Sequence, residues 1–154
     1  MQNSTMNSTP IPAIGEGKRG ENGHIGYLLR QAYAAYRIRM EQALRESGLT
    51  LPQFSVLTML AAYPTASGAE LARLSLLTPQ TMSVIVANLE RAGIVSREPH
   101  KLHGRIQVIH ITKAGTAVLS RCKLAVQSVE NALLTDVNAR DEKVVRRWLV
   151  SIAK

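Results

Sequence analysis

Apolar side chains recur at helical spacing along much of this chain, and helix-breaking residues separate the periodic stretches. The first stretch, residues 25–47, has an apolar or aromatic side chain at every third or fourth position and stops at Gly48. The second opens at Thr50, which has the spacing of a capping box with Gln53, and stops before Pro64. We expect one helix in each stretch. The inward side of the second is predicted to be Phe54, Leu57, Leu60 and Ala61.

A short amphipathic helix is predicted directly after these two. Ser67 and Glu70 have the spacing of a capping box, in which each side chain satisfies a free backbone N–H of the first turn. The buried side of this helix is predicted to be Leu71, Ala72 and Leu74.

The next helix is delimited clearly by its end residues. Thr78 is a favourable N-cap, and Pro79 occupies the first helical position, where its missing N–H costs nothing. Gly93 ends the helix, because glycine readily adopts the left-handed conformation found there. An apolar stripe at helical spacing is predicted to face the core: Met82, Ile85, Val86 and Leu89. The side chains predicted to face outward are Gln80, Thr81, Ser83, Val84, Ala87, Asn88 and Arg91.

After Gly93 the chain changes from helical spacing to strands and then back to helices. Residues 94–98 and 105–111 are rich in β-branched side chains, and residues 99–104 interrupt both strands, which predicts a hairpin. Thr112 then caps a long helix that ends near residue 134, and Asn138 caps a last one. The apolar stripe of that last helix is Val145, Trp148, Leu149 and Ile152.

This order of elements is typical of a winged helix-turn-helix, which is mainly α-helical with a small β-hairpin as its wing. We therefore expect a winged lobe at about residues 50–111, flanked by helices at about 24–47 and 112–154. Residues 1–23 are rich in Asn, Ser, Thr, Pro and Gly without periodicity, which predicts a disordered tail. Nucleic-acid binding is the leading hypothesis for such an arrangement.

Small, uncharged, hydrogen-bonding side chains on the helix after Thr78 suit contacts with base edges in a DNA major groove. Basic side chains at the hairpin would contact phosphates or a minor groove. The candidate DNA-binding residues are Thr78, Gln80, Thr81, Ser83 and Asn88 in the helix and Lys101, His103 and Arg105 in the wing. The alternative is an ordinary exposed helix and hairpin tip, as in a winged helix that serves as a protein–protein adaptor.

Three segments together resemble the multiple antibiotic resistance regulator (MarR) family of bacterial transcription factors. They are residues 48–62, LTPQTMSVIVANLERAGIV at 77–95 and IHITKAG at 109–115. The resemblance extends from about Gly26 to the C-terminus. It implies a homodimer in which the helices at about 24–47 and 112–154 intertwine between subunits. It further implies binding to a pseudo-palindromic operator in double-stranded DNA, usually as a repressor that a small ligand or oxidation releases.

The chain departs from the family's pattern in the wing, the helix and the turn. Members commonly place an aspartate and then arginines in the wing, where this chain has His103, Gly104 and Arg105. Val84 stands where many members carry an arginine, and Leu76 stands where many have a glycine. The operator sequence therefore does not carry over from relatives.

The resemblance also implies an effector pocket between the dimerisation helices and the winged lobe, often occupied by aromatic carboxylates or phenols. The candidate lining residues are Tyr33, Tyr36, Arg37, Met40 and Phe54. Core packing is the alternative explanation for these same side chains.

Charge, hydrophobicity and cysteine content indicate which partners and which compartment to expect. The formal net charge is +8 over 154 residues, which favours polyanionic partners, although residues 67–111 hold only five Lys or Arg against three Asp or Glu. No apolar run approaches the roughly 18 residues of a membrane helix, and we expect a cytoplasmic protein. The single cysteine, Cys122, is expected to be packed within the long helix rather than to sense oxidants.

Motifs for catalysis and for cofactors are absent from the sequence. There is no Gly-rich phosphate loop, no nucleophile with a neighbouring base and no carboxylate pair in a recognisable context, so we expect neither an enzyme nor a cofactor. His100 and His103 have no acidic or thiol partners at metal-ligand spacing, and we expect no metal site.

Overall fold

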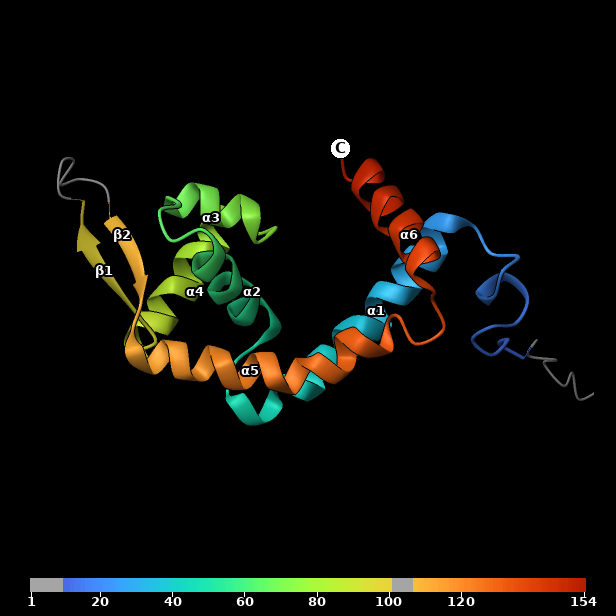
Figure 1. The fold of residues 1–154 in the computed structure, drawn as a ribbon, viewed down its shortest axis with the longest axis horizontal. Coiled ribbons are helices and arrows are strands. Elements are labelled where there is room, and N and C mark those ends of the chain that lie inside the picture. Colours follow the sequence, from blue (N-terminus) through green and yellow to red (C-terminus); the bar gives the residue numbers. More distant parts are fainter. Residues whose placement is uncertain (1–9, 101–106) are drawn as a thin grey trace, which may run out of the picture. The chain divides into compact units, whose positions relative to one another are not determined.

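The structure is a computed structural model that describes residues 10–100 and 107–154. The chain divides into two compact units, Met1–Ile38 and Arg39–Lys154. The helices are η1 (Gly17–Arg19), α1 (Ile25–Leu44), η2 (Arg45–Ser47), α2 (Leu51–Ala62), α3 (Gly68–Leu74), α4 (Pro79–Arg91), α5 (Lys113–Ala132) and α6 (Ala139–Ile152), and the strands are β1 (Val95–Pro99) and β2 (Gln107–Ile111) (Figure 1). Six α-helices with one antiparallel two-stranded sheet confirm the predicted fold class for the described residues.

The first unit contains local structure ahead of α1 that the sequence pattern did not predict. The short helix η1 lies within a stretch that was expected to be a tail. Arg19 Nη1 donates to the carbonyl oxygen of Pro12 at 2.9 Å, and Gln31 Nε2 of α1 donates to the carbonyl oxygen of Arg19 at 3.0 Å. These bonds tie residues 12–19 to the first turns of α1.

In the second unit, capping side chains fix the starts of the helices at the predicted positions. The hydroxyl of Thr50 accepts from the Gln53 N–H at 3.3 Å, and that of Thr78 accepts from the Thr81 N–H at 3.2 Å. Asn138 Oδ1 likewise accepts from the first turn of α6. Each cap satisfies a backbone donor that has no partner within its own helix, which sets where the helix begins.

The capping box at the start of α3 also affects a carboxyl group. Ser67 donates to Glu70 Oε2 from its backbone N–H at 2.8 Å and from its hydroxyl at 2.7 Å. These two bonds lower the pKa of the Glu70 carboxyl below its usual value, the backbone bond contributing most. Because the pKa is depressed in the folded protein, the associated stabilisation is present at neutral pH and is lost as the pH falls through the folded-state pKa.

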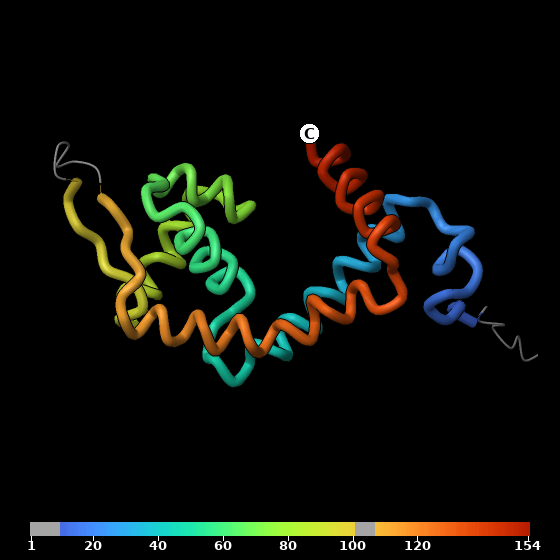
Figure 2. Tube along the Cα trace, in the orientation of Figure 1, coloured from blue at the N-terminus to red at the C-terminus, as the bar shows by residue number. Residues whose placement is uncertain are grey.

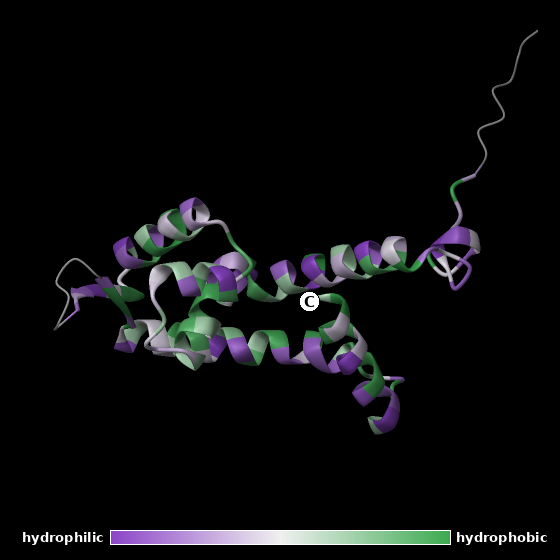
Figure 3. Ribbon diagram, turned by 90° about the horizontal axis from the view of Figure 1, so that it is seen from above, coloured by the Kyte–Doolittle hydropathy of each residue, from purple (hydrophilic) through white to green (hydrophobic). Residues whose placement is uncertain are grey.

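Helices α2, α3 and α4 and the sheet lie against one another (Figure 2), and the core of the winged lobe lies between them. Hydrophobic and hydrophilic residues alternate around the helices, as their spacing predicted (Figure 3). The predicted stripe of α4 is buried along its whole length, which confirms it. The buried side chains of this core include Phe54, Val56, Leu57, Leu60, Leu71, Ala72, Met82, Ile85, Val86, Leu89, Val95 and Ile109.

Two inward-facing assignments were wrong. Leu74 was expected on the buried side of α3 but is 36% exposed, whereas Ser75 is only 7% exposed. Because the helix has 3.6 residues per turn, Ser75 lies one turn after the buried Leu71 and turns toward the core in place of Leu74. Ala61, in the last turn of α2, is exposed as well.

The turn between α3 and α4 holds an unusual backbone conformation. Leu76 has a φ of +55°, and among the described non-glycine residues it alone has a positive φ. Its side chain is 93% exposed, so burial of the leucine does not offset the strain. A residue with a β-carbon pays about 1–2 kcal/mol to adopt this left-handed conformation.

We expect Leu76→Gly to raise the free energy of unfolding by about 1 kcal/mol, because relief of this strain exceeds the entropic cost of a glycine. Urea denaturation of the variant and the wild type measures the change. Leu124→Gly is the matched control, since it removes an exposed leucine from the middle of α5. That variant should lose about 1 kcal/mol. Equal losses in both variants would contradict a strained turn.

Strands β1 and β2 form an antiparallel hairpin that places two side chains in the core. Val95 pairs with Ile111, and Arg97 pairs with Ile109. Val95 and Ile109 are buried, while Arg97 and most of the intervening side chains are exposed. The strands begin and end within two residues of the predicted positions along the described chain.

The start of α5 packs closely against the end of α4 and the sheet. The hydroxyl of Thr112 donates to the carbonyl oxygen of Gly93 at 2.7 Å, and its N–H donates to the carbonyl oxygen of Ile94 at 3.0 Å. Gly115 is buried one turn later, where a β-carbon would overlap that same carbonyl oxygen. Further along α5 the buried stripe includes Cys122, whose thiol is enclosed and therefore poorly placed to meet oxidants in solution.

Helix α6 buries none of its residues within the single chain. Its predicted apolar stripe is present but open, with Trp148 39% exposed. The remaining members of the stripe, Val145, Leu149 and Ile152, are exposed to a similar degree. An apolar stripe of this size is unfavourable in water unless another surface covers it.

Candidate nucleic-acid interface

The surface of α4 opposite its buried stripe is termed the outward face. Its side chains are separated by three or four residues, so they lie along one side of the helix. The outward face consists of Gln80, Thr81, Val84, Ala87, Asn88 and Arg91. Because Pro79 starts the helix and four apolar side chains anchor it to the core, this surface is held on a rigid element.

At the start of α4 the predicted residues Thr78 and Thr81 contact each other. Their hydroxyl oxygens lie 2.9 Å apart, and the hydroxyl of Thr78 also accepts from the Thr81 N–H. Thr78 therefore caps the helix, as its position predicted. Both side chains are exposed at the end of the helix, where free backbone N–H groups favour an anion.

Asn88 and Arg91 are coupled near the other end of the outward face. Arg91 Nη1 donates to Asn88 Oδ1 at 3.0 Å, which leaves the Asn88 amide nitrogen able to donate elsewhere. Arg91 carries the one charge on this face, all of whose residues the structure describes. The rest of the face is uncharged and combines hydrogen-bonding groups with methyl groups.

Ser83 lies beside the outward face rather than on it. Its hydroxyl donates to the carbonyl oxygen of Pro79 at 3.0 Å. It also lines a hollow of about 280 Å³ between α3, α4 and the hairpin, together with Arg97 and Gln107. Of the five helix residues predicted to contact DNA, Gln80, Thr81 and Asn88 share one face, Thr78 caps its start and Ser83 flanks it.

The sequence interpretation missed Arg97, which lies beside the outward face together with Ser83. Its Nε donates to Glu90 Oε2 at 3.0 Å, which links the last turn of α4 to strand β1. The side chain is partly exposed and lines the same hollow as Ser83, beside the outward face. A basic residue in a strand next to an acidic residue at a helix end was the available signal, but the pairing depends on the tertiary fold.

The wing's tip residues Lys101, His103 and Arg105 fall outside the described residues. Their expected contacts with DNA remain predictions. Below the tip, His110 Nε2 lies 3.9 Å from Glu98 Oε2, so the two strands carry an exposed polar pair.

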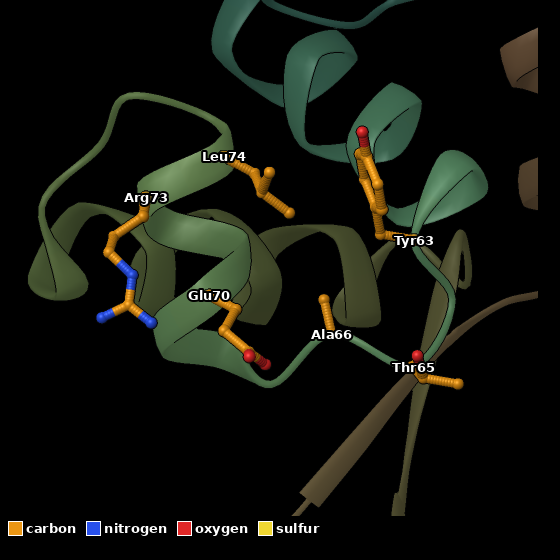
Figure 4. A pocket seen from close by; sticks show the side chains of 6 residues that line it. All are labelled: Tyr63, Thr65, Ala66, Glu70, Arg73 and Leu74. Carbon is orange, nitrogen blue, oxygen red and sulfur yellow. The ribbon is translucent and has the colours of Figure 1, made fainter. Parts of the chain in front are cut away.

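A second hollow, of about 380 Å³, lies between the end of α2 and helix α3 (Figure 4). Glu70 and Arg73 line it from α3, while Tyr63 lies across from them at the end of α2. Its remaining lining residues are Thr65, Ala66 and Leu74. None of the residues predicted for an effector pocket takes part in it.

Those predicted effector residues fall in both units of the chain. Tyr33, Tyr36 and Arg37 lie on α1 in the first unit, with the two tyrosine ring centroids 6.5 Å apart. Met40 and Phe54 lie in the second unit, where both are buried among core residues. Core packing accounts for Met40 and Phe54, and the effector pocket as a whole remains a prediction.

Residues 10–100 and 107–154 contain neither a metal site nor a membrane-spanning helix. No group of three or more His, Cys, Asp or Glu side chains in that part of the chain is arranged to hold a metal ion. None of its helices has the length and apolar composition needed to cross a membrane.

Comparison with known proteins identifies the family. The model of the MarR family matches residues 47–106, which include α2, α3, α4 and β1. The chain is also 35% identical over 129 residues to the HTH-type transcriptional repressor Rv2887 of Mycobacterium tuberculosis, spanning 84% of this chain and 93% of that protein. The chain belongs to the MarR family. It is therefore a DNA-binding transcription regulator and not an enzyme, as the sequence predicted.

Solved structures agree with this assignment. The crystal structure of the MarR-family protein Rv2887 in complex with salicylic acid superimposes with a TM-score of 0.67 at 34% identity, covering 86% of this chain and 98% of that one. The Staphylococcus aureus MepR–DNA complex gives a TM-score of 0.79 at 18% identity, covering 86% of this chain and 96% of that one. At this low identity the second likeness concerns the fold alone.

Proposed function

We propose that this MarR-family regulator is a homodimeric repressor that binds a pseudo-palindromic operator through α4 and the wing, and that a small aromatic acid releases it. The proposed DNA contacts in α4 are Thr78, Gln80, Thr81, Ser83 and Asn88, and those in the wing are Lys101, His103 and Arg105. A regulator of this kind works where the DNA is, in the cytoplasm.

The observation that carries this proposal is the chemistry of the outward face of α4. Gln80 and Asn88 lie two turns apart on a helix anchored by its buried stripe, and amide side chains match the donor and acceptor groups of an adenine edge. An exposed surface that served only solubility would carry more charge. Arg91 and the wing cations supply the attraction to phosphate that holds the face in place.

Dimerisation is proposed to involve α1, α5 and α6. Support comes from the open apolar stripe of α6 around Trp148 and from the exposed Ile25, Tyr33 and Ile38 of α1. A two-fold dimer presents one α4 from each subunit to the same side of a duplex. The two half-sites should therefore repeat about 10 base pairs apart, which is one helical turn.

An aromatic carboxylate is proposed as the class of effector. Rv2887, which shares 34% identity with this chain in the compared structure, forms a complex with salicylic acid. Tyr33, Tyr36 and Arg37 on α1 carry aromatic and cationic groups of the kind that suits such a ligand, whereas Met40 and Phe54 are buried in the core.

Selection of bound fragments from genomic DNA with the purified protein tests the function. We expect one enriched palindromic motif and steep loss of binding with rising salt, because cations on the protein displace counterions from phosphates. Addition of salicylate and related phenolic acids should then lower operator binding. A protein–protein adaptor would enrich no motif and would show no such salt dependence.

A further inference from the structure

Val84 lies in the middle of the outward face of α4, where an apolar side chain does not contribute to the core. It is 60% exposed, and the buried stripe lies on the opposite side of the helix. Its neighbours one turn away in either direction are Gln80, Thr81, Ala87 and Asn88. None of these neighbours offers a large apolar surface for the valine to pack against.

The helix does not favour a valine at this position either. Branching at the β-carbon restricts the side chain in a helix and costs roughly 0.5 kcal/mol relative to alanine. The exposed methyl groups gain nothing in water. Folding therefore leaves this side chain unexplained, whereas every other apolar residue of α4 larger than alanine is buried, apart from Pro79 at its start.

The chemistry of a major groove supplies a partner for such a side chain. Among the four bases only thymine presents an apolar group there, its C5 methyl, and the other edges display donors and acceptors. A valine pressed against those edges would bury polar groups without a hydrogen bond, which is unfavourable. Against a thymine it buries methyl groups on both sides.

We propose that Val84 is a specificity-determining residue that packs on the C5 methyl of one thymine in each operator half-site. This inference rests on the proposed function, since it requires α4 to enter the groove. Gln80 and Asn88, one turn to either side, would then hydrogen-bond to base pairs flanking that thymine. The nearest charge on the same face, that of Arg91, lies two turns along, so the central contact is an apolar one.

Replacement of single thymines by deoxyuridine in the selected operator tests the contact, because this change removes the methyl and keeps the pairing. For the wild type we expect one thymine per half-site whose replacement weakens binding about fourfold, the value of one buried methyl group. In Val84→Ala that replacement should change binding less than twofold. Val84→Thr, which keeps one methyl, should show an intermediate effect.

Asn88→Ala is the matched control, since it lies on the same face one turn along. It should weaken operator binding yet keep the fourfold effect of the missing thymine methyl. All variants should remain folded at the temperature of the binding assay, which thermal unfolding checks, because the altered side chains are exposed.

Failure of the Val84–thymine contact can be distinguished from failure of the proposed function. A wild type that selects an operator but shows no thymine whose methyl effect depends on Val84 overturns the inference alone. The inference also fails if Asn88→Ala abolishes the methyl effect as completely as Val84→Ala does. A wild type that selects no DNA sequence overturns both proposals.

Discussion

Gly115→Ala should lower the free energy of unfolding by about 3 kcal/mol, at the upper end of the range for overpacking a core. The added β-carbon would overlap the carbonyl oxygen of Ile94 and would lie 2.8 Å from Cγ2 of Ile111. The carbonyl cannot move aside freely, because it accepts a hydrogen bond from the N–H of Thr112, whose hydroxyl is held by the neighbouring carbonyl oxygen of Gly93. Relief would require α5 to separate from β1, which opens the core beneath the hairpin.

Urea denaturation measures this effect, with Gly68→Ala as the matched control. A β-carbon at Gly68, in the first turn of α3, meets no atom within 4 Å. That variant should stay within about 0.5 kcal/mol of the wild type. A Gly115→Ala protein with an unchanged unfolding midpoint would show that α5 does not pack against Ile94 as described.

The double variant Trp148→Ala with Leu149→Ala should raise the dimer dissociation constant at least about 100-fold. Truncation of large apolar side chains at a buried interface costs about 3 kcal/mol or more, and each 1.4 kcal/mol is tenfold in affinity. Both side chains belong to the apolar stripe of α6 that the single chain leaves open. Because folding and association are linked in such dimers, the variant should also unfold at lower temperature as it is diluted.

Sedimentation equilibrium across the micromolar range measures the dissociation constant. Lys143→Ala is the matched control, since Lys143 lies on the basic side of α6, away from the stripe, and should leave the dimer intact. A wild-type protein that is folded and monomeric at micromolar concentration would contradict dimerisation through α6.

Features governed by neighbouring residues could be predicted from the sequence. The caps Thr50, Ser67, Thr78 and Thr112 and the buried stripe of α4 are confirmed, because each depends on side chains within one or two turns. The same locality made the start of every helix from α2 to α6 predictable to within about one residue. Element order followed from these boundaries, and the fold class followed from the order.

Features governed by tertiary contacts could not be predicted in this way. Ser75 rather than Leu74 is buried at the end of α3, and this depends on how that short helix packs against its neighbours. The pairing of Arg97 with Glu90 joins a strand to a helix, and no periodic pattern indicates it. The structured turns around Arg19 arise from single hydrogen bonds to backbone carbonyls in a segment without periodicity.

Two departures from the family's pattern, at Leu76 and at Val84, have different physical consequences. Leu76, where many members carry a glycine, holds a positive φ that glycine would adopt without strain. Val84, where many members carry an arginine, leaves a nearly uncharged face. We expect the first departure to lower stability, and we propose that the second changes which DNA sequence the helix recognises.

The central claim is that α4 contacts base edges, and Gln80→Ala tests it most directly. Binding of wild type and variant is measured on the selected operator and on a scrambled duplex, each at two salt concentrations. We predict a loss of about 1–3 kcal/mol on the operator and almost none on the scrambled duplex, because Gln80 is uncharged and non-specific affinity comes from cations near phosphates. The salt dependence should be the same for both proteins. Equal losses on the two duplexes would contradict the account, because they would mean that α4 contacts only the DNA backbone.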